Sequence, residues 1–133
     1  HAGWRGTALG IAARMVATLT ERFSSRPEDI LAVIGPAIGP CCYQVDAPVF
    51  EAFSAMPGAG RFLRPCREKG RWMVDLALAN RLQILAAGVP SKNIYISGLC
   101  TACRQDLFFS HRAAGGRAGR QISLIMLSEE ELH

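Results

Sequence analysis

The segment 31–40 constrains the fold more than any other part of the sequence, because an apolar run ends there in two Gly-Pro steps. Residues Leu31–Ile34 show no polar alternation, which is typical of a strand buried on both faces. Gly35-Pro36 and Gly39-Pro40 then predict a turn. No apolar run in the sequence approaches the roughly eighteen residues that a membrane span needs. The pattern therefore predicts a strand in the interior of a globular domain.

A single domain of ordinary size fits the length of 133 residues. Hydrophobic residues make up 50% of the chain, which is enough for one core and argues against disorder. The chain starts at His1, without an initiator Met or a basic-then-apolar leader. We therefore expect residues 1–133 to be part of a longer protein.

Helical and strand patterns alternate along the chain. The expected helices cover about 7–23, with Leu9 and Val16 on its apolar face, 47–55 after the N-cap Asp46, and 76–87 after the N-cap Asp75. The expected strands cover 31–34, 71–74, 94–97 and 121–127, and the tail 128–133 is expected to fray. The alternation predicts one α+β (mixed α/β) domain with a mixed sheet.

The net charge is +4, and only Lys69 and Lys92 among the 15 basic residues are lysines. Arginine-rich chains favour phosphate or carboxylate partners, whereas a nucleic-acid surface is less favoured because the arginines are scattered and few aromatics accompany them. The five cysteines are an odd number in a chain without a leader. This count favours reduced thiols in the cytoplasm over a disulfide framework.

The first candidate site is the segment 1–7, in which Gly3 and Gly6 allow a close approach to the backbone. Arg5 offers a forked guanidinium, and the helix expected to start here offers unpaired N–H groups, so the segment is a candidate anion site. His1 is a candidate metal ligand or acid–base group. The alternative is that the glycines make a turn, that Trp4 fills the core and that His1 is an exposed terminus.

The second candidate site is the turn 35–40 with Cys41 and Cys42, which offer a nucleophile or thiolate ligands. Buried, inert cysteine is the alternative and the commoner fate. Cys100 and Cys103 have the CxxC spacing of zinc or redox sites. A zinc ribbon would need Cys41 and Cys42 as its second pair, and adjacent cysteines suit tetrahedral ligation poorly, so a structural zinc is not favoured.

The third candidate site is the polar segment 104–120. Asp106, Ser110 and His111 are residue types of acyl-transfer triads, but no G-x-S-x-G elbow surrounds the serine. Three arginines beside glycines offer a second anion clamp, with a solvated loop as an equal alternative: Arg112, Arg117 and Arg120.

Taken together, the ordered motifs closely resemble one known family. They are His1-Ala2-Gly3-Trp4-Arg5-Gly6-Thr7, Ile34-Gly35-Pro36-Ala37-Ile38-Gly39-Pro40-Cys41-Cys42-Tyr43, Cys100-Thr101, Phe108-Phe109-Ser110-His111-Arg112 and Gly119-Arg120. This set is similar to the YfiH family, also called the laccase-domain or multicopper polyphenol oxidase family and now regarded as purine nucleoside phosphorylases. The resemblance implies a layered α/β/β/α arrangement with a mixed β-sandwich, of which residues 1–133 would be the C-terminal part.

The resemblance also implies a zinc-dependent enzyme that phosphorolyses adenosine, inosine, guanosine and methylthioadenosine and deaminates adenosine. The family's zinc is held by two histidines and one cysteine, of which His1 would be the last in sequence. The other two belong to a His-Gly pair and a Thr-x-Asp-Cys segment, which this chain lacks, and Cys41 and Cys42 are not expected to replace them. His111 stands where some members have Tyr.

For phosphate, the expected site is Arg5 with the N-terminus of the first helix, and Arg112 and Arg120 are second candidates. A copper-dependent polyphenol oxidase is the alternative enzyme, although the chain offers few histidines for several coppers: His1, His111 and His133. A non-catalytic fragment with an incomplete metal site is the third alternative, and exposed apolar surface would make such a fragment prone to association.

Overall fold

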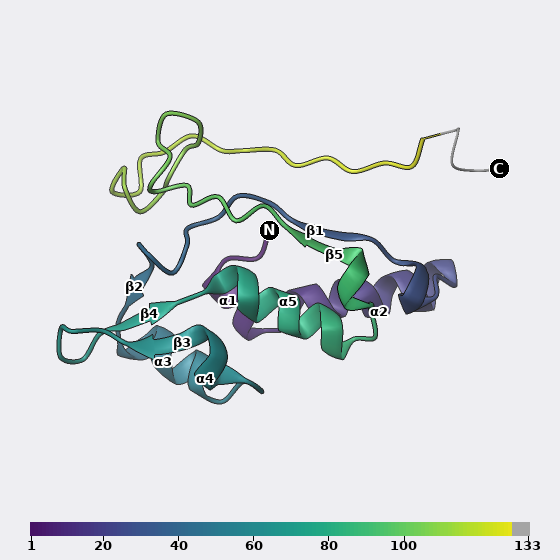
Figure 1. Cartoon of the computed structure of the whole chain (residues 1–133), viewed down its shortest axis with the longest axis horizontal. Helices are drawn as coiled ribbons and strands as arrows, with labels where there is room; N and C mark the ends of the chain where they lie inside the picture. The colour runs from purple at the N-terminus through teal and green to yellow at the C-terminus, as the bar shows by residue number, and fades with distance from the viewer. Residues whose placement is uncertain (129–133) are drawn as a thin grey trace.

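The computed structural model describes residues 1–128, which form short helices around two small sheets (Figure 1). In chain order the elements are α1 (Trp4–Ala8), α2 (Ile11–Phe23), η1 (Pro27–Asp29), β1 (Ala32–Ile34), β2 (Gln44–Val45), α3 (Ala47–Ser54), α4 (Ala59–Phe62), β3 (Leu63–Pro65), β4 (Trp72–Val74), α5 (Leu76–Ala86), η2 (Ser91–Asn93) and β5 (Ile94–Ile96). The η elements are 3₁₀ helices. Helices combined with parallel and antiparallel strand pairing confirm the expected mixed α/β class.

The N-terminal segment forms two helices, so the expected single helix over 7–23 is wrong. α1 already starts at Trp4, and α2 starts only at Ile11. Gly10 lies between them with a φ of 74°, a left-handed conformation that residues with a Cβ disfavour. The break turns Leu9 to solvent, while Val16 remains buried on α2.

β1 and β5 pair in parallel, with Ala32 opposite Ile94. Both expected strands are confirmed, within one residue at their ends. The expected burial of the first strand on both faces is wrong, because Val33 is 61% exposed. Side chains alternate between the faces of a strand, and only the face that carries Ala32 and Ile34 packs against α2 and α5.

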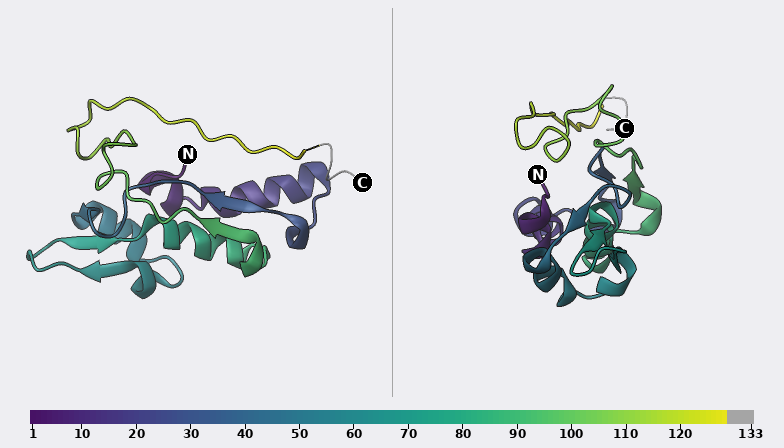
Figure 2. Two further views of the ribbon diagram at one scale, coloured as in Figure 1. Left: turned by 45° about the horizontal axis from the view of Figure 1, so that its top comes forward. Right: turned by 90° about the vertical axis from the view of Figure 1, so that its left-hand side faces the viewer.

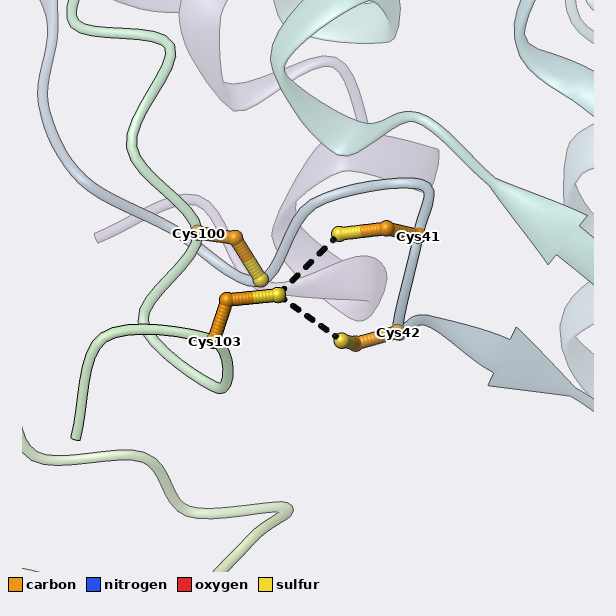
Figure 3. Close-up of side chains that lie close together, drawn as sticks. All are labelled: Cys41, Cys42, Cys100 and Cys103. Carbon is orange, nitrogen blue, oxygen red and sulfur yellow. Dashed lines mark hydrogen bonds between the residues drawn. The ribbon is translucent and has the colours of Figure 1, made fainter.

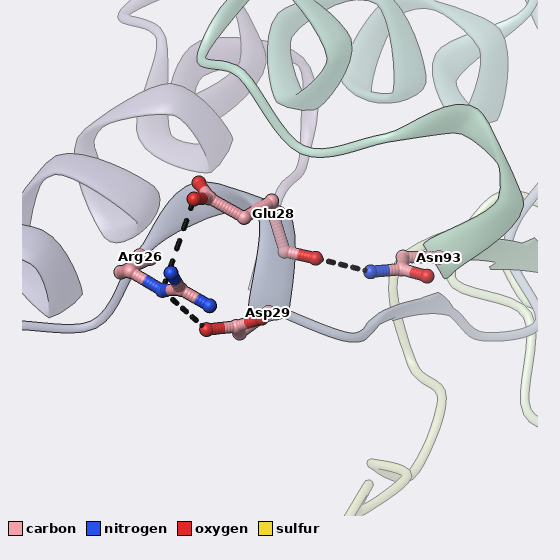
Figure 4. A network of polar contacts seen from close by, with 4 residues as sticks. All are labelled: Arg26, Glu28, Asp29 and Asn93. Atoms are coloured by element: carbon pink, nitrogen blue, oxygen red, sulfur yellow. Dashed lines mark hydrogen bonds and ion pairs between the residues drawn. The ribbon is translucent and has the colours of Figure 1, made fainter.

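Polar contacts join the two 3₁₀ helices that precede these strands (Figure 4). The side-chain amide of Asn93 donates a 2.9 Å hydrogen bond to the backbone carbonyl of Glu28. Within the same turn, Nε of Arg26 lies 2.8 Å from a carboxylate oxygen of Asp29 and 3.8 Å from one of Glu28. The contact places the starts of β1 and β5 side by side.

β2, β4 and β3 form an antiparallel sheet with β4 in the centre. The strand expected over 71–74 is confirmed as β4, and α3 matches the helix expected over 47–55. Asp46 precedes α3 as expected, but its side chain makes no capping hydrogen bond, so the expected cap is wrong. Its carboxylate lies 3.9 Å from the guanidinium of Arg71 instead.

α5 joins the two parts of the hydrophobic core. Its start is capped as expected, because a carboxylate oxygen of Asp75 accepts a 2.9 Å hydrogen bond from the N–H of Leu78. One core lies between the antiparallel sheet and the helices α3, α4 and α5, and its buried members are Tyr43, Val45, Val49, Phe53, Phe62, Val74, Leu76 and Ala79. The other lies between α2, α5 and β5 and contains Val16, Ile84, Val89 and Ile94.

The segment after β5 runs back along the outside of the molecule. Its last part is extended and passes over the side of the domain that carries β1 and β5, opposite α3 and α4 (Figure 2). Residues 121–127 form no strand, so that expectation is wrong: the segment is rich in apolar residues, but no neighbouring strand pairs with it. The expected fraying of the tail concerns residues 129–133, which lie outside the described residues.

Within residues 1–128, no helix is both long enough and apolar enough to cross a membrane.

Candidate functional site

The segment that carries His1 is held against α5 by a buried polar anchor. Thr7 is fully buried, and its hydroxyl donates to the carbonyl of Ala2 at 3.2 Å. The same hydroxyl accepts a 2.9 Å hydrogen bond from the amide of Asn80, and the backbone carbonyl of Thr7 accepts one of 2.6 Å from Gln83. These bonds fix the backbone between Ala2 and Thr7, so the segment leaves α1 in a defined direction.

His1 itself is exposed. No group of three or more metal-ligand residues in the described part of the chain includes it. The two histidines and one cysteine that the resemblance implies are therefore not complete within residues 1–128. His1 offers one nitrogen ligand, and a zinc ion bound there needs further ligands from outside this segment.

Arg112 lies over the ring of Tyr43, and the charge of Arg5 also acts on this tyrosine. The guanidinium carbon of Arg112 is 5.2 Å from the ring centroid of Tyr43, and Nη1 of Arg112 donates a 2.7 Å hydrogen bond to the carbonyl of Gln44. The guanidinium carbon of Arg5 lies 4.4 Å from the ring centroid of Trp4. Trp4 is partly buried against the core, which agrees with the alternative interpretation of this segment. Burial raises the pKa of Tyr43, and the positive charges of Arg112 and Arg5 partly oppose this shift. The charges of two arginines from distant parts of the chain thus act on the same tyrosine.

The other residues proposed from the sequence lie apart from this pair. Arg120 is exposed, and its guanidinium donates to the carbonyl of Ala118 at 3.4 Å. Asp106 makes two hydrogen bonds, of 2.9 and 2.8 Å, to Arg104, which lowers the pKa of the Asp106 carboxyl. Asp106 is therefore engaged by Arg104, and the structure gives no support to a triad with Ser110. Arg5 lies in the first turn of the five-residue α1, which starts earlier than expected.

A cavity of about 300 Å³ opens where the parallel strands end. The loops after β1 and β5 form its rim, with Gly35, Gly39 and Ser97 among the lining residues, and Asp75 and Arg81 of the α5 region line its other side. Ligands commonly bind at the carboxyl ends of parallel strands. The cavity agrees with the prediction that the Gly-Pro turn lies at the edge of the sheet where ligands bind.

The same two loops bring four cysteines together (Figure 3). Cys41 and Cys42 come from the turn before β2, and Cys100 and Cys103 from the turn after β5. The four sulfur atoms all lie within 4.8 Å of one another, and Sγ of Cys103 is 3.4 Å from that of Cys42 and 3.6 Å from that of Cys41. The sequence did not favour a structural zinc because Cys41 and Cys42 are adjacent, yet the structure brings both pairs together. This cluster is able to hold a metal ion.

The two ends of the cluster differ in acidity. Burial alone would raise the pKa of Cys100, but hydrogen bonds from the N–H groups of Gly39 and Cys103 help to lower it to about 6. Hydrogen bonding to Cys103 is the main cause that raises the pKa of Cys42 to about 12, with Cys41 and burial adding to it. One sulfur is thus stabilised as a thiolate, while a neighbouring one is held as a thiol.

Sequence reasoning missed Tyr43 and the pair Thr7–Asn80. Tyr43 directly follows the cysteine pair, and an aromatic residue after a turn of this kind is a usable signal. Nothing in the sequence marks Asn80 as the partner of Thr7, because 73 positions separate them on different helices.

Comparison with known proteins gives a consistent result. The family model described as multi-copper polyphenol oxidoreductase laccase matches residues 1–128. The purine nucleoside phosphorylase YlmD of Geobacillus stearothermophilus is 50% identical over 133 residues, which are 98% of this chain and 48% of that protein. A purine nucleoside phosphorylase of Bacteroides thetaiotaomicron is 40% identical over 131 residues, which are 96% of this chain and 47% of that protein.

Among solved structures, the hypothetical protein YfiH of Bacillus licheniformis superposes with a TM-score of 0.83 at 45% identity, over 88% of this chain and 44% of that one. The chain thus spans about half the length of the relatives that it matches. The family match covers nearly the whole chain, and the fold agrees with it. The chain therefore belongs to the YfiH-type laccase-domain family, whose model is described as multi-copper polyphenol oxidoreductase laccase.

Proposed function

We propose that residues 1–133 are the C-terminal part of a zinc-dependent purine nucleoside phosphorylase. Its substrates are phosphate and adenosine, inosine, guanosine or methylthioadenosine, and it also deaminates adenosine. The names of the relatives support the phosphorylase class. The observation that carries the proposal in this chain is the position of Arg112 over the ring of Tyr43, a residue on which the charge of Arg5 also acts.

Phosphorolysis needs a phosphate ion held near C1′ of the ribose while the glycosidic bond breaks. Guanidinium groups suit this role, because their paired N–H donors match phosphate oxygens. Arg5 and Arg112 provide two such groups, and the bond from Arg112 to the carbonyl of Gln44 leaves its other N–H groups for a ligand. We assign the phosphate site to this pair, with Arg120 as the less supported candidate because it lies on a separate exposed stretch.

His1 is assigned as one of three zinc ligands, and the other two come from polypeptide beyond this chain. A bound zinc would supply activation of water for attack on C6 of adenine in the deamination. What the chain contributes here is the position of His1. The anchor at Thr7 fixes the backbone that leads to it.

The alternative enzyme is a copper-dependent polyphenol oxidase, which the description of the family model favours. Several coppers require many histidine ligands. Among the described residues only His1 and His111 are histidines, and His133 lies outside them. A non-catalytic fragment with an incomplete metal site is the remaining alternative.

We place the protein in the cytoplasm, because five cysteines that are all free suit a reducing compartment.

The test uses the complete protein that contains this chain, loaded with zinc. It is incubated with adenosine, inosine and methylthioadenosine, each with and without phosphate, and the products are separated by chromatography. We expect release of free base that depends on phosphate, and deamination of adenosine to inosine or hypoxanthine. Both activities should be lost in His1→Ala. Oxygen uptake with a phenol and bound copper would support the oxidase instead. No turnover in a folded, metal-replete sample would support the fragment alternative.

A further inference from the structure

The cysteine cluster lies outside the site that involves His1. It comprises Cys41, Cys42, Cys100 and Cys103, and His1 does not belong to it. The phosphorylase proposal makes no use of these four sulfurs. Their convergence therefore needs its own explanation.

The spacing of the sulfurs matches that of a tetrahedral metal site. Four sulfurs at about 2.3 Å from a zinc ion lie about 3.8 Å from one another. Sγ of Cys103 is 3.4 Å from Sγ of Cys42 and 3.6 Å from Sγ of Cys41, and all four sulfurs fall within 4.8 Å of one another. Binding a metal thus requires each sulfur to shift by only about an ångström or less.

The backbone around the cluster holds the two cysteine pairs in register. Ala37 and Cys100 form a parallel β-bridge, with hydrogen bonds from Ala37 to the carbonyl of Leu99 and from Thr101 to the carbonyl of Ala37. The N–H of Gly39 points at Sγ of Cys100 at 3.2 Å. Hydrogen bonds of this kind orient a thiolate ligand and support its negative charge. The two turns are therefore joined independently of any metal.

The donor set decides which metal and which role fit. Four sulfur ligands disfavour magnesium and calcium, which prefer oxygen, and favour zinc in the tetrahedral geometry. Four protein ligands also leave no open position for a substrate, which is the property of structural zinc sites. We propose that Cys41, Cys42, Cys100 and Cys103 form a structural four-thiolate zinc site.

This site would fasten the turn that leads directly into Tyr43 to the loop after β5. The guanidinium of Arg112 lies over the ring of Tyr43 and donates a hydrogen bond to the carbonyl of Gln44. The zinc would thereby hold the start of β2 and the arginine contact in place without touching substrate. The proposed zinc site does not depend on whether the protein is a phosphorylase.

The first test measures metal on the complete protein, purified under reducing conditions without chelator. Besides the zinc assigned to His1, we expect one further equivalent that survives in His1→Ala and is lost in the double variant Cys42→Ser/Cys103→Ser. Cys66→Ser is the matched control, because Cys66 is a free cysteine outside the cluster, and it keeps the metal. Full zinc content in the double variant, or none in His1→Ala, would overturn the proposal.

A second test avoids cysteine variants, which are at risk of misfolding. Cobalt replaces zinc in the His1→Ala protein, and its absorption reports both geometry and ligands. We expect the intense d–d absorption bands of tetrahedral cobalt. We also expect a sulfur-to-cobalt charge-transfer band with the intensity of four thiolate ligands. A mercurial reagent that titrates four thiols should release the metal from the same protein. A cobalt spectrum without sulfur bands, or a disulfide found by mass spectrometry in place of metal, would contradict the site.

Discussion

Asn80 on α5 donates a buried 2.9 Å hydrogen bond to the hydroxyl of Thr7, across 73 positions of sequence. Both residues are buried, and the hydroxyl itself donates a 3.2 Å hydrogen bond to the carbonyl of Ala2. The geometry of the His1 segment therefore depends on a helix that belongs to the middle of the domain. A change in this pair acts on the N-terminal motif without touching it.

Replacing Thr7 with Val removes the acceptor for Asn80 and the donor to Ala2. The amide of Asn80 keeps its hydrogen bond to the carbonyl of Leu76, but its other N–H loses its acceptor. An unmatched buried donor costs about 1–3 kcal/mol, so the free energy of unfolding should fall by that amount. Urea denaturation measures it. Thr18→Val is the control, because the Thr18 hydroxyl bonds to Arg14 within α2 on an exposed surface. Equal stability of the two variants would show that the buried bonds contribute nothing.

Replacing Arg5 with Ala in the complete protein should raise the KM for phosphate. Loss of a charged hydrogen-bond donor costs about 1.5–3 kcal/mol, which corresponds to a rise of roughly 10- to 100-fold. The exposed Arg14 on α2 provides the control, and Arg14→Ala should leave the value unchanged. Steady-state kinetics at varied phosphate decide the matter. An unaltered phosphate KM in the Arg5 variant would remove Arg5 from the phosphate site.

Replacing Gly39 with Ala should weaken zinc binding at the cysteine cluster. A Cβ at this position would lie 3.2 Å from Cβ of Cys100 and 3.3 Å from Sγ of Cys41, so these two ligands must shift by a few tenths of an ångström. Gly60→Ala is a matched control, because a Cβ there meets nothing within 4 Å. Competition with a zinc-binding dye should show roughly a tenfold loss of affinity or more for the first variant. Equal affinity would mean that the turns adjust freely.

The ion pair of Arg26 with Asp29 should make stability depend on pH at the acidic end. The hydrogen bond and charge of Arg26 lower the pKa of the Asp29 carboxyl. Its contribution is therefore complete above the ordinary carboxyl pKa of 3.8 and is lost as the pH falls through the lowered value in the folded state. Because both groups are exposed, the effect is small. Comparing Arg26→Ala with the parent should show stability curves that merge below this range; curves that stay parallel would contradict the linkage.

The isolated chain of 133 residues should self-associate as its concentration rises. Ile122, Leu124 and Met126 are 85, 93 and 88% exposed, and Val33 and Tyr95 are exposed on the parallel sheet. Apolar patches of this kind promote contact between molecules. Sedimentation velocity should show larger species that diminish in Ile122→Ser/Leu124→Ser. A monomer at all concentrations would show that the exposed side chains do not adhere.

Elements with a local signal were predicted well from the sequence. α5 is an example, since Asp75 caps it and the apolar residues that follow reach both parts of the core. The helix over 7–23 was wrong because its apolar spacing continues through Gly10, where the backbone turns left-handed. The strand over 121–127 was wrong because an apolar segment alone supplies no hydrogen-bonding neighbour.

The candidate site divides in the same way. Arg5 and Arg112 were chosen from motifs; the structure places Arg112 over the ring of Tyr43, and the charge of Arg5 also acts on that residue. The convergence of Cys42 with Cys103 was not expected, because it depends on a tight turn in which the N–H of Cys42 bonds to the carbonyl of Gly39. Contacts between positions about sixty residues apart leave no periodic trace in the sequence.

The order of the strands has a consequence for how the chain folds. β2, β3 and β4 all lie between β1 and β5 in sequence, so the parallel pair closes only around a long excursion. Bringing distant segments together costs chain entropy before any contact forms, whereas β3 and β4 follow each other along the chain and β2 lies fewer residues from β4 than β1 lies from β5. We expect the β2–β4–β3 unit and α5 to form early and to shorten the remaining gap. The pairing of Ala32 with Ile94 would then be the late step that limits the folding rate.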